Sequence, residues 1–207
     1  MSKPRATRSR DAEKTRADIL RAARVLFTTR GYTQAGVRDI AAKVGVDPAL
    51  VMRYFVSKKD LFRAALESEP SATEWFRIPK SRFGADLVSH LFGKPLAEAD
   101  GLAMLLRAAG DDEVRDIATN VVQARFIQPL AQWLGPPSAQ ARASLFFALL
   151  SGVWTYRRLI PLRALTARAD ARGVTTQLAA MLQRLVDGPP SRRRFKSTTV
   201  DRRTARR

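Results

Sequence analysis

Hydrophobic residues recur along this chain at the spacing of helices, whereas the alternation typical of strands is scarce. The first strong segment covers residues 11–30 and precedes Gly31, a residue that favours the end of a helix. A second, shorter segment covers residues 37–44. One face of each segment is apolar, with Ile19, Ala23, Leu26 and Phe27 in the first and Val37, Ile40, Ala41 and Val44 in the second. The pattern predicts an all-α fold.

A stop and a restart follow the second segment over residues 45–48. Gly45 can take the left-handed conformation that ends a helix. Asp47 can cap the next helix, and Pro48 fits its first position, where no backbone N–H is needed. Two short helices joined by a glycine-containing turn are typical of a helix-turn-helix, whose second helix fits the major groove of DNA. The alternative is an ordinary corner between two helices.

A further helix is predicted to begin at Ser57, because Ser57 and Asp60 form a capping pattern. Lys58 and Lys59 fill its first turn, where cations are disfavoured. A phosphate held there by free N–H groups and a lysine would explain this choice. The alternative is a solvated pair of lysines at a small energetic cost.

The rest of the chain, residues 70–187, reads as helices separated by breaks. We expect helices over residues 83–92, 96–109, 113–133, 139–159 and 174–186. Residues 71–79 read as irregular, and the Gly-Pro-Pro-Ser stretch at 135–138 as a stop and a restart. Pro129 should kink the helix over 113–133, or Gln128 should end it.

Charge adds a second signal, since 37 Lys and Arg residues face 19 Asp and Glu residues, a formal net charge of +18. Much of the excess lies near the ends. We therefore expect residues 1–10 to form a basic flexible arm and residues 188–207 a basic disordered tail, both suited to polyanions. The alternative reading of the two charged ends is solubility alone.

Several classes of protein are disfavoured. Cysteine is absent and His90 is the lone histidine, which excludes thiolate metal sites, disulfides and multi-histidine sites. No phosphate-binding glycine loop or nucleophile elbow is present, so we expect no enzyme, no metal and no cofactor. The acidic run at 111–113 looks like helix capping. Without a long apolar run or a secretory signal, we expect a soluble, cytoplasmic protein and no membrane partner.

The stretch ILRAARVLFTTRGYTQAGVRDIAAKVGVDPALVMRYFVSKKDLFRAAL, residues 19–66, closely resembles the DNA-binding domain of the TetR family of bacterial transcriptional repressors. The matching positions include Ala23, Leu26, Phe27, Gly31, Tyr32, Ile40, Ala41, Gly45, Val46, Phe55, Ser57, Lys58 and Leu61. The resemblance implies a homodimer with two helix-turn-helix heads, here residues 11–68, on a larger helical body, here 70–187. In the family, the body usually binds a small molecule that releases the operator.

The match departs from the family at some DNA-facing positions. Ala35 and Gly36 stand where relatives often have two threonines, and Met52 stands where a tyrosine is common. We expect the exposed face of the third helix to present Pro48, Ala49, Met52 and Arg53, which is mostly apolar and suits thymine methyl groups. Arg38 and Arg53 are the candidates for hydrogen bonds to bases, and Tyr54 and Lys58 for contacts to phosphates.

Two further sites are expected in the body. The apolar faces of the helices over 139–159 and 174–186 should form a four-helix dimer interface, unless both are internal core. A small apolar or aromatic effector would contact Trp75, Phe76, His90, Met104, Phe126, Trp133 and Trp154, unless these residues are plain core or, for His90, surface.

The sequence thus predicts a sequence-specific regulator that binds a palindromic operator in double-stranded DNA. We expect a repressor, associated with the nucleoid when bound to DNA. The alternatives are an activator and a non-specific architectural DNA-binding protein, the latter favoured by the net charge.

Overall fold

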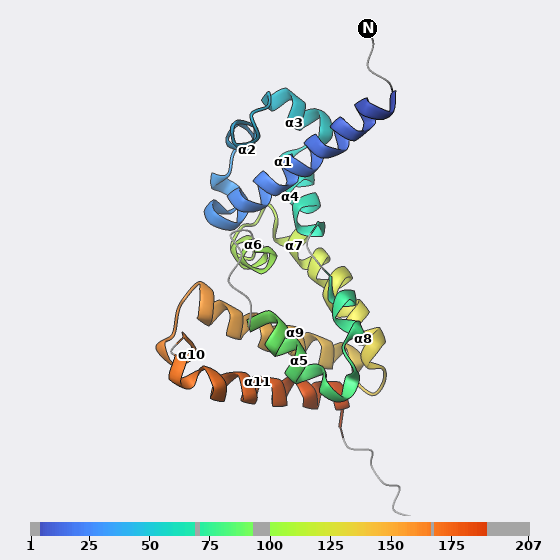
Figure 1. Cartoon of the computed structure of the whole chain (residues 1–207), viewed down its shortest axis with the longest axis vertical. Helices are drawn as coiled ribbons and strands as arrows, with labels where there is room; N and C mark the ends of the chain where they lie inside the picture. The colour runs from blue at the N-terminus through green and yellow to red at the C-terminus, as the bar shows by residue number, and fades with distance from the viewer. Residues whose placement is uncertain (1–4, 69–70, 93–99, 167, 190–207) are drawn as a thin grey trace, which may run out of the picture.

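The computed structural model describes residues 5–68, 71–92, 100–166 and 168–189, and all regular secondary structure within these ranges is helical. The helices are α1 (Arg5–Gln34), α2 (Val37–Val44), α3 (Pro48–Tyr54), α4 (Lys58–Glu67), α5 (Phe83–Phe92), α6 (Gly101–Ala108), α7 (Arg115–Val122), α8 (Gln128–Leu134), α9 (Ala139–Arg158), α10 (Arg163–Thr166) and α11 (Arg168–Asp187). Short 3₁₀ turns cover Ala72–Arg77 and Lys80–Arg82. Figure 1 shows a head made by α1–α4 above a body that contains α5 and α8–α11.

The first helix begins at Arg5 rather than at residue 11, so residues 5–10 of the expected flexible arm are helical. The physical reason is that this stretch contains no glycine or proline to stop a helix, while Pro4 precedes it in the sequence. Gly31 breaks the helix as expected, with φ 79° and ψ 176°. The first four residues of the arm, and the tail from residue 190, lie outside the described residues.

The head packs around an aromatic group, in which Phe62 of α4 meets Phe27 of α1 edge-on at 5.1 Å and Tyr32 at 5.4 Å between ring centroids. This core does not stop at the end of α4. Met104 of α6 and Ile117 of α7 are buried in the same apolar cluster. The head is therefore packed directly onto α6 and α7, a long-range contact that no local pattern in the sequence indicates.

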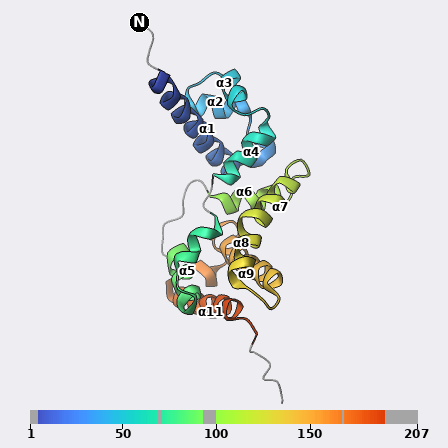
Figure 2. The same cartoon turned by 90° about the vertical axis from the view of Figure 1, so that its right-hand side faces the viewer.

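The body has a second core, formed by α5, α8, α9 and α11 around Phe83, Leu87, Phe146 and Leu182. Figure 2 shows α5 running beside α11 at the end of the molecule away from the head. Gly84 permits this close approach, because a Cβ atom there would lie 2.2 Å from a backbone oxygen of α11.

The helix expected over residues 113–133 is continuous but carries a wide turn. A π-helical segment, Gln123–Ile127, joins α7 to α8, and the N–H of Gln128 bonds the carbonyl of Gln123. Pro129 cannot donate a hydrogen bond, and its ring would clash with the carbonyl four residues earlier in a regular helix. The wider turn accommodates the proline without ending the helix.

The stop at residues 135–138 is fixed by one buried cation. The Arg142 guanidinium donates to the carbonyls of Pro137 at 3.0 Å and Leu185 at 2.9 Å, and also to that of Gly135. Because these acceptors lie in the loop before α9 and in the last turn of α11, Arg142 joins this loop and α9 to the end of α11. A buried charge of this kind is stabilised only when all its donors are satisfied.

Candidate DNA-binding site

The interruption at residues 45–48 has the predicted form. Gly45 is left-handed, with φ 76° and ψ 36°, and its N–H bonds the carbonyl of Ala41 at 2.9 Å. The Asp47 carboxylate accepts from the N–H of Ala49 at 2.7 Å, and Pro48 occupies the first helical position. The two helices α2 and α3 therefore form a helix-turn-helix, and α3 lies at the outer end of the head (Figure 1).

The inner face of this unit is anchored by Ile40 and Val51, which are fully buried. The opposite face of α3 is open to solvent, and the side chains predicted to lie there are all exposed: Pro48, Ala49, Met52 and Arg53. A short helix that packs one face against the protein core and exposes the opposite face to solvent is the arrangement that enters a DNA groove.

Arg38, in the first turn of α2, is exposed. The start of this helix is fixed by Asp39, whose carboxylate accepts from the N–H of Gly36 at 3.1 Å and lies 3.6 Å from Arg30. Asp39 thus satisfies the N–H of the N-cap residue, while Gly36 has no side chain to cap the first turn of α2. Ala35, the other departure from the family pattern, is fully buried, so its position is part of the core.

Two guanidinium groups lie at the C-terminal end of α3. Arg53 lies over the ring of Tyr54 at 6.0 Å, and Arg16 of α1 lies over the ring of Phe55 at 5.2 Å. Sequence reasoning missed Arg16, because the family resemblance starts at Ile19. Its position could have indicated this contact, because Arg16 lies one turn before the buried Ile19. From there, the aliphatic part of an arginine can extend along the edge of the core while its guanidinium stays exposed.

Ser57 caps α4 as expected, since its hydroxyl oxygen accepts from the N–H of Asp60 at 3.0 Å. The Lys58 ammonium group lies 4.4 Å from the centroid of the Tyr32 ring and donates to the carbonyl of Thr33 at 3.4 Å. Lys58 therefore has an intramolecular partner at the end of α1. The phosphate contact expected for Lys58 stays a prediction.

The turn between α6 and α7 also contacts the head. The Thr33 hydroxyl donates to Asp111 at 2.7 Å, and Glu113 lies 3.9 Å from Lys59. Asp111 also accepts from the N–H of Glu113 at 3.0 Å, so its carboxylate stabilises the turn before α7. The expected helix capping is wrong in detail, because the N-cap of α7 is Val114 and no side chain caps this helix. Burial, and then the negative charges of Glu113 and Asp111, raise the pKa of the Tyr32 phenol.

The residues proposed to contact an effector are distributed over several places. Trp75 lies 5.9 Å from Phe126, and Phe76 stacks on Trp133 at 5.2 Å, so these two pairs line the body core together. The other three lie apart from them: Met104 in the core shared with the head, His90 exposed on α5, and Trp154 half-buried on α9.

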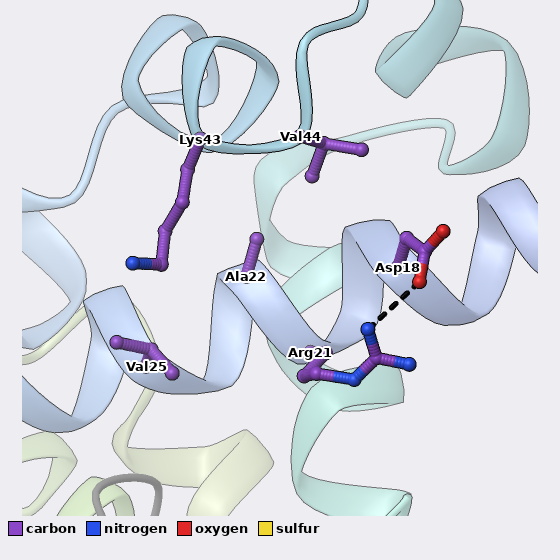
Figure 3. Close-up of a pocket in the computed structure, with 6 residues that line it drawn as sticks. All are labelled: Asp18, Arg21, Ala22, Val25, Lys43 and Val44. Atoms are coloured by element: carbon purple, nitrogen blue, oxygen red, sulfur yellow. Dashed lines mark hydrogen bonds and ion pairs between the residues drawn. The ribbon is translucent and has the colours of Figure 1, made fainter.

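One open pocket of about 340 Å³ lies in the head, between α1 and α2. Figure 3 shows its mixed lining, with the ion pair between Asp18 and Arg21 at one end and Lys43 extending from α2 towards α1 at the other end. None of the seven residues proposed for an effector lines this pocket. Among the described residues, no helix is long and apolar enough to cross a membrane.

The geometry defines a helix-turn-helix DNA-binding protein, and comparison with known families makes the assignment specific. Residues 19–65 match the sequence model described as bacterial regulatory proteins of the tetR family. Residues 81–186, more than half of the chain, match the model described as the tetracyclin repressor-like C-terminal domain. The chain belongs to the TetR family. Proteins of this family are DNA-binding transcriptional regulators rather than enzymes.

Individual relatives agree with this family. The HTH-type transcriptional repressor Rv3405c of Mycobacterium tuberculosis is 37% identical over 90 residues, which are 42% of this chain and 47% of the relative. The chain thus spans about half the length of that relative. A TetR-family regulator of Streptomyces coelicolor A3 superposes with a TM-score of 0.54 at 26% identity, over 85% of this chain and 96% of the other.

A more distant structure shares the fold. It is a transcriptional regulator from Saccharomonospora viridis in complex with choline. Its TM-score is 0.53 at 23% identity, over 84% of this chain and 95% of the other.

Proposed function

We propose that this protein is a sequence-specific repressor that binds a palindromic operator as a homodimer and is released by a small molecule. The observation that carries the proposal is the exposed outer face of α3, held from behind by Val51 and flanked by Arg38 and Arg53. A helix of this kind reads base edges, and the two arginines beside it can donate hydrogen bonds to bases.

A dimer is supported by apolar surface that a single chain leaves uncovered. On α9, Leu145 is 57% exposed and Tyr156 is 44% exposed, and Leu149 and Gly152 lie on the same helical face between them. On the adjacent helix α11, Met181 is 47% exposed. Two such helices and their symmetry mates would make a four-helix interface, which would place two heads on one palindromic site.

Release by an effector requires that the body be coupled to the head. The buried Thr28 hydroxyl of α1 accepts from the N–H of Asp100 at 3.2 Å, at the start of α6. Val122 and Phe147 pack against both apolar cores. Because the two cores share these residues, a rearrangement around Trp75 and its aromatic neighbours would reach α1 and α4. The choline complex of a regulator with the same fold supports an effector of small size.

An architectural, non-specific DNA-binding role is the second candidate, since the formal net charge is +18. Genome-wide crosslinking and sequencing of the bound DNA separates the two functions. The proposed repressor should give a few sharp peaks, each with a palindromic motif, next to genes whose transcription rises when the protein is removed. Broad coverage without a shared motif would contradict the proposal and support the architectural role.

A further inference from the structure

The outer face of α3 offers few groups that hydrogen-bond to bases. Pro48 has no N–H, Ala49 carries only a methyl group, and the N–H of Ala49 is already bonded to the Asp47 carboxylate at 2.7 Å. Arg53 lies in the last turn of the helix, with its guanidinium over the ring of Tyr54. The residues at the start of α3, which in a helix-turn-helix lie nearest the base edges, are therefore apolar.

Met52 extends this apolar surface by one turn. It follows Pro48 by four positions and Ala49 by three, so the three side chains share one face of α3. Met52 is 40% exposed, so its side chain is accessible to a partner that approaches this face of α3. Its unbranched thioether chain is flexible and polarizable, and can adapt to an irregular surface.

We infer that α3 recognises its operator through the 5-methyl groups of thymine, with Met52 and Ala49 as the specificity-determining contacts. This inference rests on the proposed function. Thymine alone among the four bases presents a methyl group in the major groove, whereas the other edges present donors and acceptors that apolar side chains cannot satisfy. A guanine or cytosine facing Met52 would lose water without gaining a hydrogen bond, which is unfavourable. Arg38 supplies hydrogen-bonded readout from α2, at a different base pair.

Recognition through thymine methyl groups predicts where thymine occurs in the operator. Each half-site should contain thymines at the base pairs that face the start and the middle of α3. A palindromic site would repeat them on the opposite strand in the other half.

Replacing thymine by deoxyuridine tests this directly, because the substitution removes the methyl group and leaves every donor and acceptor unchanged. The full chain first selects its preferred duplex from a random pool, and each thymine in one half-site is then replaced singly. We expect about a fourfold rise in Kd at one or two positions. This is the ratio of dissociation constants that corresponds to the free energy of transferring one methyl group from water to an apolar surface. The remaining thymines should show no change.

The Met52→Ala variant completes a double-mutant cycle between protein and DNA. At the thymine that faces Met52, the variant should bind thymine and deoxyuridine equally well. Arg38→Ala serves as the matched variant, and it should keep the full thymine preference at that position. Circular dichroism of both variants controls for folding.

Different results would contradict recognition through thymine methyl groups and the proposed function as a regulator. A selected duplex that binds equally well with deoxyuridine at every position, or a selected motif without thymine in the half-sites, would overturn the inference and leave the regulator intact. Failure to select any duplex would contradict the proposed function, and the inference would fall with it.

Discussion

The hydroxyl of Thr33 donates a 2.7 Å hydrogen bond to the carboxylate of Asp111, 78 residues later in the chain. Thr33 follows the break in α1 at Gly31, and Asp111 stabilises the turn before α7. The end of the first head helix is thus tied to the part of the chain that enters the body. Lys58 and Lys59 of α4 contact the same region, through Thr33 and Glu113 respectively.

Removing this tie should cost measurable stability. Thr33→Val deletes the hydroxyl at nearly constant volume and leaves Asp111 without this donor. We expect a loss of about 1 kcal/mol in the free energy of unfolding, the usual net value of such a bond. Urea denaturation at one fixed protein concentration measures it. Thr29→Val is the matched control, because the Thr29 hydroxyl bonds only carbonyls of its own helix, chiefly that of Val25. Equal losses in both variants would show that the contact to Asp111 contributes nothing.

Asp100 should give stability a specific pH dependence. Burial raises the pKa of its carboxyl above the ordinary 3.8, although the N–H groups of Ala103 and Leu102 oppose the shift. The folded state therefore holds this proton to higher pH than the unfolded state does. Stability from this group is highest in acid and falls as the pH rises from 3.8 to the folded-state pKa.

The Asp100→Asn variant keeps a capping side chain without this titration. Its stability relative to the natural protein should increase as the pH rises from about 4 towards 7. Asp100→Ala should lose about 1 kcal/mol at neutral pH, because it also loses the cap to Leu102. Thermal unfolding of the three proteins across this pH range provides the measurement. A difference between the Asp100→Asn variant and the natural protein that does not change with pH would contradict the assignment.

Two helical glycines should respond in opposite directions to alanine. Gly84→Ala would place a Cβ atom 2.2 Å from the carbonyl oxygen of Ala179, so α5 and α11 would have to separate. We expect a loss of about 1–3 kcal/mol, as for other overpacked sites. Gly173→Ala meets open space, and should stabilise α11 by about 0.5–1 kcal/mol. Denaturant unfolding of both variants measures these changes in stability. An unchanged stability of the Gly84→Ala variant would contradict the tight contact between α5 and α11.

Cations around α3 should differ in how they affect DNA binding. Arg16→Ala and Lys58→Ala should weaken binding to all sequences and reduce the slope of log K against log salt by about 1 each. Arg38→Ala should instead relax the preference at one base pair per half-site, by about 1–3 kcal/mol. Arg107, exposed on α6, is the control cation whose removal leaves the slope unchanged. DNA affinities of the variants, measured over a series of salt concentrations, test these expectations. An unchanged slope for Arg16→Ala would show that Arg16 does not contact the DNA backbone.

The dimer interface should be sensitive to charge on α9 and α11. Leu145→Glu and Met181→Glu each place a carboxylate on the proposed interface, and should shift the protein to a monomer in sedimentation velocity. Val56→Glu is the control, since Val56 is 88% exposed in the turn after α3 and lies outside the proposed interface. Variants that sediment as the natural protein does would show that these two helices do not form the interface.

The sequence predicted the helix-turn-helix to the residue because its signals are local. Gly45, Asp47 and Pro48 each act within one turn of their own position, and the structure has α2 end and α3 begin where they indicate. Phe83–Phe92 was predicted equally well from its apolar face. Contacts between distant segments could not be read in this way. Neither the buried Arg142 nor the close approach of Gly84 to α11 has a signature at short range.

The difference between local signals and contacts of distant segments also explains why the sequence did not predict the position of Arg16 or the π-helical segment. Arg16 lies next to Phe55 only because α1 crosses the end of α3. The π-helical segment before Pro129 is a response to a proline that the surrounding packing keeps within a helix, and a proline alone predicts only a kink or an end.

The central claim is that α3 gives this protein a preference for one DNA sequence. A competition experiment measures this most directly, with the full chain, a labelled duplex obtained by selection, and an unlabelled scrambled duplex of the same composition at one fixed salt concentration. We predict that the selected duplex binds about 1,000-fold more tightly or better, as specific sites do. Equal affinity for the two duplexes would contradict the account.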